Sequence, residues 1–410
     1  MSSNTLFIII LIVFTADFIF ERYISFLNIK SSKNSIPAPL ADIYDAEKYA
    51  KQQKYFRANS RYGMFTSAFG FFVMLLMLLL GGFGWLDGII RSFNLTELSN
   101  TLIFFGVLFF ANEILTMPFE IYDIFVIEQR FGFNRVTPKI FVLDKLKTCL
   151  LAVIIGGGLV SLIVWIYQLA PDCFWLLAFG AISLFALCAG FLYSDIIVPL
   201  FNKQTPLPAG ELRDEIELFS KKAGFELKNI YVIDGSKRST KANAYFTGFG
   251  SRKRIVLYDT LIEKMSVKEI VAVLSHEIGH YKRRHTLKGL AIALPANLLL
   301  FILLGIILKS RIFAEALGSE PSFYINILSF AILYSPFSTL IDVLQNILTR
   351  KFEYQADNFS KSHNLGNELV SALKKLSANS LSNLTPHPLA VFVRYSHPTL
   401  EQRIENLERN

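Results

Sequence analysis

The sequence predicts a mainly α-helical protein with seven membrane-crossing helices and, on one side of the membrane, an α+β region with a small sheet. Hydrophobic residues make up 52% of the 410 residues, and 38 residues are phenylalanine. This composition is too apolar for an ordinary soluble domain. Uncharged apolar stretches of about 20 residues, the length that crosses a bilayer, recur along the chain. Two long polar stretches, 195–285 and 342–410, follow the fifth and the seventh of these spans.

Five of the apolar stretches contain no charged residue. They are 63–86, 148–171, 173–194, 289–308 and 321–341. Two further stretches, 5–20 and 101–119, each carry one carboxylate, Asp17 and Glu113. An ionisable group inside a span usually faces protein or water, so both are predicted to cross the membrane. The first could instead be a signal peptide, but no basic residue precedes it and no small-residue cleavage site follows, so we expect it to be retained.

Basic residues gather in alternate loops. The loops 21–61 and 121–147 are rich in Lys and Arg, whereas Arg91 is the one basic residue between the second and third spans. Cytoplasmic loops carry the excess of Lys and Arg, so the N-terminus is predicted outside and the C-terminus in the cytoplasm. The membrane is a bacterial inner membrane or the endoplasmic reticulum, depending on the source. The net charge of +8 therefore reflects topology, and without a nucleic-acid-binding motif we expect membrane lipid but no nucleic acid as a partner.

The chain divides by composition into four parts. Residues 1–194 hold spans one to five, 195–288 a first cytoplasmic region, 289–341 spans six and seven, and 342–410 a second cytoplasmic region. The first cytoplasmic region begins with helical spacing over 212–223. Three short runs rich in β-branched and aromatic residues follow and predict a small sheet, with a hairpin around the glycines at 248 and 250. These runs are 230–233, 244–247 and 254–258.

A helix with a metal-binding pattern follows this sheet. Ser266 and Glu269 fit a capping box, which marks the start of a helix. His276 and His280 are four residues apart, so they share one face of that helix and can bind a single ion. Glu277 is placed to reach a water bound to that ion. The competing interpretation is a solvated helix in which the two histidines merely neighbour basic residues.

A third ligand must come from elsewhere, because a catalytic zinc normally has three protein ligands and one open position. His285 would lie about 140° around a continuous helix from His280, which makes it a poor partner. Glu353 is a better candidate, since the two preceding spans return the chain to the side of His276. Asp357, one helical turn further, could accept a hydrogen bond from a ligating histidine. An ordinary charged helix face would show the same spacing.

Further motifs point to a family. They are 127–134 (IEQRFGFN), 199–203 (PLFNK), 205–207 (TPL), 243–246 (NAYF), 275–280 (SHEIGH), 353–357 (EYQAD) and 395–398 (YSHP) with Arg403. With these motifs the chain resembles, nearly end to end, the type I CAAX prenyl endopeptidases, membrane zinc proteases that release the last three residues of farnesylated proteins. It departs at Thr247 and Thr399, where the family leads us to expect an aromatic residue and a second proline.

The resemblance implies a zincin-like, gluzincin-type protease region with one Zn²⁺ per chain. The implied zinc ligands are His276, His280 and Glu353, and Glu277 is implied to be the general base. Asp357 would support a ligating histidine. His397 becomes a candidate for stabilising the oxyanion that forms when the peptide carbonyl is attacked.

The resemblance also has implications for the substrate. Arg403 is a second candidate for stabilising the oxyanion. Asn243 and Tyr245 are expected on a strand that pairs with an extended peptide or protein substrate, whose C-terminus is prenylated. The spans are implied to enclose a large water-filled chamber, and Glu113, Glu120 and Asp123 would line it or pair with other groups.

Two other functions stay open on sequence grounds. One is a quality-control metalloprotease that digests damaged membrane proteins, although such proteases usually have fewer spans. The other is a transporter or channel with a structural metal, for which Glu277 would be incidental. A chelator-sensitive peptidase assay separates this last function from the two enzymes.

Overall fold

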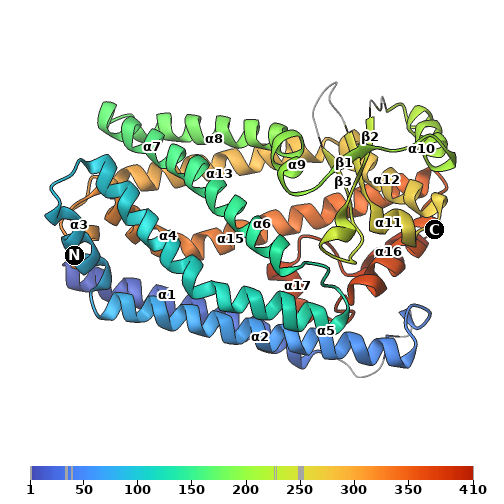
Figure 1. The fold of residues 1–410 in the computed structure, drawn as a ribbon, viewed down its shortest axis with the longest axis horizontal. Helices are drawn as coiled ribbons and strands as arrows, with labels where there is room; N and C mark the ends of the chain where they lie inside the picture. The colour runs from blue at the N-terminus through green and yellow to red at the C-terminus, as the bar shows by residue number, and fades with distance from the viewer. Residues whose placement is uncertain are drawn as a thin grey trace.

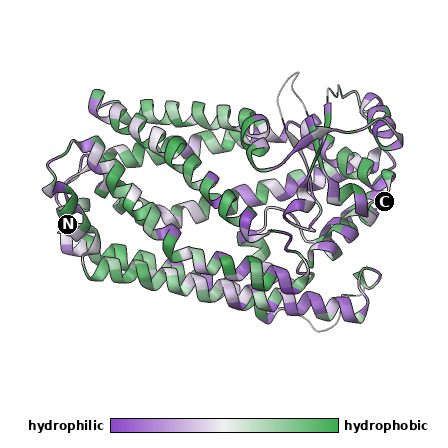
Figure 2. Cartoon of the chain, in the orientation of Figure 1, coloured by the Kyte–Doolittle hydropathy of each residue, from purple (hydrophilic) through white to green (hydrophobic). Residues whose placement is uncertain are grey.

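The computed structural model describes residues 2–32, 36–37, 40–225, 227, 229–247 and 254–409. Long helices run along the molecule from the end that holds the N-terminus to a mixed α and β region that holds the C-terminus (Figure 1). Seven helices in the described residues are long and apolar enough to cross a membrane, which confirms the predicted number. Their apolar residues occupy the part of the molecule away from the mixed region. Hydrophilic residues gather in the mixed region itself (Figure 2).

The spans are built from single helices or from helices joined through a wider π-helical turn. The single helices are α1 (Ser3–Lys30), α2 (Ala46–Leu79), α13 (His285–Leu308) and α15 (Phe323–Ser362). The third span joins α4 (Glu97–Tyr122), η2 (Asp123–Glu128) and α5 (Gln129–Phe131). The fourth joins α6 (Pro138–Leu151), η3 (Ala152–Gly156) and α7 (Gly157–Leu169), and the fifth joins α8 (Phe174–Leu192), η4 (Tyr193–Ile197) and α9 (Val198–Phe201).

Most of the spanning helices extend beyond the predicted apolar stretches, and the second and seventh show why. The second helix ends at Leu79, because Gly81 adopts a left-handed φ of 66°, and Leu86 belongs to the separate helix α3 (Gly82–Ser92). The seventh span continues without a break into the second polar stretch, as the 40 residues of α15. Hydrophobicity marks only the part of a helix that meets hydrocarbon, so it does not locate helix ends outside it.

Glu113, the carboxylate predicted inside the third span, forms an ion pair, and so does Glu120 just beyond the predicted stretch. Lys145 of α6 lies 2.7 Å from a carboxylate oxygen of Glu113 and 2.7 Å from one of Glu120. These pairs join α4 to α6 and satisfy charges that would be costly alone in a membrane. The chamber implied by the family resemblance stays a prediction.

The mixed region contains a four-stranded sheet in the order β1-β2-β4-β3. Strands β2 (Asn229–Ile233), β3 (Ala244–Thr247) and β4 (Arg254–Tyr258) match the three predicted runs. β3 and β4 are antiparallel, as expected of a hairpin, but the predicted turn between them lies outside the described residues. β1 (Gln204–Pro206) was not predicted; it is three residues long and ends in proline, which sequence patterns rarely assign to a strand.

Helices complete the core on which the sheet packs. They are α10 (Glu211–Lys222), α11 (Asp259–Lys264), α12 (Val267–Lys282), α16 (Gly366–Ser380) and α18 (Leu400–Glu408). The short α14 (Ile312–Ala316) lies between spans six and seven, and α17 (Pro388–Arg394) packs on α15 and α1. Ile270 and Leu274 of α12 are almost fully buried in one cluster with Leu257 of β4. α12 also packs closely on α15, because a Cβ added to Gly279 would lie 3.1 Å from the Cα of Ala356. The two polar stretches of the sequence therefore form one unit.

Candidate metal and catalytic site

The start of α12 is fixed by the predicted capping box. Ser266 Oγ accepts a hydrogen bond from the Glu269 backbone at 3.4 Å, and Glu269 Oε2 accepts one from the Ser266 backbone at 2.8 Å. Glu269 also pairs with Lys375 of α16 at 2.7 Å. Burial raises the pKa of Glu269, but hydrogen bonds from Lys375, Ser371 and Ser266 outweigh it and lower the pKa to about 2. This contact anchors the helix that carries both histidines.

Three side chains converge where α12 crosses α15. The Nε2 atoms of His276 and His280 lie 3.1 Å apart. Glu353 places Oε1 3.2 Å from His280 Nε2 and Oε2 3.4 Å from His276 Nε2. Its Oε2 atom is buried and accepts no hydrogen bond. Two imidazoles and a carboxylate, with ligand atoms within 4.8 Å of one another, fit a metal that prefers N and O ligands.

The other ring nitrogen of His276 is held by Asp357. His276 Nδ1 lies 2.9 Å from Asp357 Oδ1 and 3.3 Å from Arg403 Nη2. An ionised carboxylate only accepts hydrogen bonds, so at the shorter of these contacts Nδ1 donates its proton to Asp357 and leaves Nε2 for a metal. Burial and Arg403 lower the pKa of His276, but the neighbouring carboxylates of Asp357 and Glu353 outweigh them and raise the pKa to about 9.

His285 contacts this site through His280, for a reason that the sequence did not reveal. The helix that was expected to be continuous is broken: α12 ends at Lys282, Arg284 has a φ of 58°, and α13 begins at His285. The His285 ring is buried. Its Nδ1 lies 3.0 Å from His280 Nδ1, and its Nε2 lies 2.9 Å from Gln355 Oε1. His285 is outside the three-residue metal group, as expected, but it is in position to orient one member of that group.

Glu277 follows His276 in α12, and His397 contacts Glu353. Glu277 is half-buried, and within the described part of the chain its carboxylate makes no hydrogen bond or ion pair, so it is available to bind water. His397 Nε2 lies 3.4 Å from Glu353 Oε1, and its side chain is 61% exposed. An exposed imidazole beside the ligands can reach a bound peptide.

Arg403, in contrast, lies behind the ligands. It donates to Asp357 from Nε at 2.9 Å and from Nη2 at 2.6 Å, and its Nη1 lies 3.5 Å from Glu353 Oε2. Its side chain is 11% exposed. These contacts favour a role in holding the two carboxylates over direct contact with a substrate oxyanion.

The predicted substrate-binding residues lie at an edge of the sheet. Asn243 directly precedes β3, where its carbonyl accepts a hydrogen bond from the Tyr258 backbone at 3.0 Å. Tyr245 lies within β3 and pairs with Val256 of β4. β3 ends the strand order, so its outer edge can pair with an extended peptide. Among the described residues, neither Asn243 nor Tyr245 contacts the three metal-site residues.

The fold and this site define an integral-membrane metalloprotease. A family model described as "CAAX prenyl protease N-terminal, five membrane helices" matches residues 25–203, and a model of peptidase family M48 matches residues 206–410. The chain belongs to peptidase family M48 and, within it, to the CAAX prenyl proteases. The resemblance predicted from the short motifs is thereby confirmed.

Similar proteins span almost the whole chain. A "CAAX prenyl protease 1 homolog" from Oryza sativa is 33% identical over 95% of this chain and 94% of its own length. "CAAX prenyl protease 1" from Saccharomyces cerevisiae is 32% identical, covering 96% of this chain and 93% of the relative. The crystal structure of S. mikatae Ste24p has a TM-score of 0.94 at 32% identity, and covers 98% of this chain and 99% of that one. These matches favour the protease over a transporter or channel.

Proposed function

We propose that this protein is a zinc endopeptidase that removes the C-terminal tripeptide of prenylated proteins or peptides. The convergence of His276, His280 and Glu353 supports the zinc site, because imidazole and carboxylate are the usual ligands of a catalytic zinc. A zinc ion bound there supplies Lewis acidity, which polarises the scissile carbonyl and acidifies water. The relatives, which are named CAAX prenyl protease 1 or its homolog, support the prenylated substrate.

Each neighbouring side chain then has one task. Glu277 accepts the proton of the attacking water and passes it to the leaving amine. His397 donates a hydrogen bond to the carbonyl oxygen as it gains negative charge. Asp357 and Arg403 keep the His276 ring oriented, through the contacts of 2.9 and 2.6 Å described above. The free edge of β3, with Asn243 and Tyr245, takes the substrate as an added strand.

We also propose that the site faces the cytoplasm, in a bacterial inner membrane or in the endoplasmic reticulum. An odd number of spans places the two termini on opposite sides of the membrane, in keeping with their positions at opposite ends of the molecule (Figure 1). The basic loops 21–61 and 121–147 support a cytoplasmic location for the end that carries the metal group.

Matched peptides test this function. The purified protein is given one peptide ending in Cys and three further residues, and the same peptide with a farnesyl group on that Cys. Cleavage before the last three residues, faster for the farnesylated peptide and abolished by a zinc chelator, is the expected result. Equal rates would argue against prenyl recognition, and activity that survives chelation would argue against the metal mechanism.

A further inference from the structure

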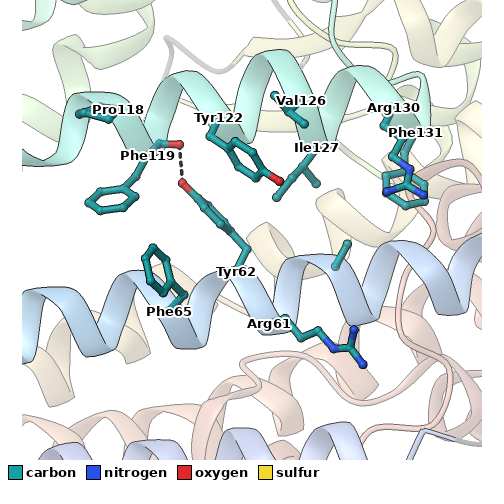
Figure 3. Close-up of a pocket in the computed structure, with 11 residues that line it drawn as sticks. Arg61, Tyr62, Phe65, Pro118, Phe119, Tyr122, Val126, Ile127, Arg130 and Phe131 are labelled. Atoms are coloured by element: carbon teal, nitrogen blue, oxygen red, sulfur yellow. Dashed lines mark hydrogen bonds between the residues drawn. The ribbon is translucent and has the colours of Figure 1, made fainter.

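A groove lies between α2 and the helix formed by α4, η2 and α5 (Figure 3). Its volume is about 610 Å³, within the range of about 300–1,000 Å³ that is usual for ligand pockets. The Tyr62 hydroxyl donates to the Phe119 carbonyl and so fixes the two walls to each other (Figure 3). Most of its lining is apolar, and none of the lining residues belongs to the metal site.

The groove is polar at one end and apolar at the other. Arg61 and Arg130 lie on opposite walls at one end, while Phe65 and Phe119 lie at the other, with ring centroids 6.0 Å apart (Figure 3). The arginine end faces the side of the molecule that carries the sheet (Figure 1). Both arginines are exposed, and within the described residues neither guanidinium pairs with a carboxylate.

We propose that this groove binds one anionic phospholipid. Its phosphate lies between Arg61 and Arg130, because guanidinium groups recognise phosphate through paired hydrogen bonds. One acyl chain follows the apolar wall past Phe65 and Phe119. The two cations, which have no carboxylate partner within the described residues, favour a phospholipid over a prenyl chain. An isoprenoid carries no anion, and a prenylated substrate must keep its C-terminal carboxylate near the metal site.

Lipid binding is expected to stabilise the contact between the spanning helices α2 and η2 and the loop that leads into β3. Beyond the arginines, Tyr55 of α2 hydrogen-bonds Glu128 of η2 at 2.5 Å, and Lys241 lies 2.8 Å from Glu128. Lys241 is two residues before Asn243, at the entry to β3. A lipid that holds α2 against η2 therefore also holds the loop that leads to the edge strand.

The experiment measures lipid binding to the delipidated full-length protein by native mass spectrometry and by thermal stability in detergent. The probes are dioleoylphosphatidylglycerol, dioleoylphosphatidylcholine and inorganic phosphate. The wild type should bind the anionic lipid about tenfold or more tightly than the zwitterionic one. An arginine beside an anionic lipid contributes about fivefold in affinity, so R61Q/R130Q should weaken this binding by roughly 30-fold.

Two control variants separate this contact from net charge and from misfolding. R135Q/K139Q also removes two positive charges, from exposed residues that follow the third span. This variant should leave lipid affinity unchanged. Val126→Trp fills the groove from a side chain that is 45% exposed, and should weaken binding of both lipids without changing charge. Retained zinc content shows that each variant is folded.

Three outcomes would overturn the proposal. The first is equal affinity for the two lipids, or unchanged affinity in folded R61Q/R130Q and Val126→Trp. The second is stabilisation by inorganic phosphate as large as that by the phospholipid, because the apolar groove would then contribute nothing. The third is unchanged lipid binding with a raised KM for the farnesylated peptide alone, which would make the groove a substrate site.

Discussion

His285 Nδ1 lies 3.0 Å from His280 Nδ1, although the two residues belong to different helices. The far side of the His285 ring contacts Gln355 of α15, and its face stacks on Phe352, with ring centroids 4.2 Å apart. The ring is therefore fixed on several sides, and through it α13 and α15 determine how one proposed zinc ligand is oriented.

Replacing His285 should weaken zinc retention. Loss of a side chain that orients a ligand typically costs about 10- to 100-fold in metal affinity, so His285→Ala should lose zinc to a competing chelator at correspondingly lower concentration. His363→Ala is the control, because His363 contacts Phe359 and not the metal group. Identical chelator titrations for wild type and His285→Ala would show that the contact does not position His280.

Glu277→Gln should keep the metal and lose turnover. The amide is the size of the carboxylate but accepts no proton, so kcat should fall by about 10²- to 10⁴-fold with zinc content near one per chain. Glu263→Gln, an exposed change on α11, serves as the control. A Glu277→Gln enzyme that cleaves at the wild-type rate would remove Glu277 from its role as base.

Glu353→Gln should instead deplete the metal. It replaces an anionic ligand with a neutral amide and leaves Arg403 without one of its two carboxylates. Zinc measured by elemental analysis after purification should fall well below one per chain, while circular dichroism reports whether the helices remain. Full zinc occupancy in a folded variant would exclude Glu353 as the third ligand.

His397→Gln should lower kcat with little change in KM or zinc content. In the proposed mechanism its imidazole donates to the developing oxyanion, and loss of one such donor costs about 10²- to 10³-fold in kcat. The comparison is Arg403→Lys, in which weakened contacts with Asp357 and Glu353 should reduce zinc retention as well. If His397→Gln lost metal to the same extent, His397 would be a structural residue.

Glu269→Gln should destabilise the fold and flatten its response to acid. The pKa of Glu269 is lowered to about 2 by Lys375, Ser371 and Ser266, against burial. Its contribution is therefore complete above the ordinary glutamate pKa of about 4.5 and is lost as pH falls toward 2. Thermal unfolding should show a loss of about 1–2 kcal/mol in the variant at neutral pH.

The difference between wild type and Glu269→Gln should shrink between pH 4.5 and 2. Glu263→Gln, whose side chain is exposed, is expected to leave the profile unchanged. A constant difference across this range would mean that charge on Glu269 does not support the start of α12.

Most of the fold could be predicted because its elements follow from local chemistry. Apolar stretches about as long as a bilayer is thick gave the seven spans, and the capping box gave the start of α12. The prediction failed where one residue or a distant partner decided the structure. Gly81 ended the second span, Arg284 separated α12 from α13, and β1 exists through its pairing with β2.

For the site, the sequence by itself determined the helix with His276 and His280, because helical spacing is a local property. It made the distant Glu353 a candidate partner, which the family resemblance then implied as a ligand. Only the tertiary structure decided that Arg403 lies behind the ligands and that His285 supports one of them. Both depend on how α12, α13, α15 and α18 pack, and such packing joins residues about 46 or 70 positions apart in ways that no spacing rule encodes.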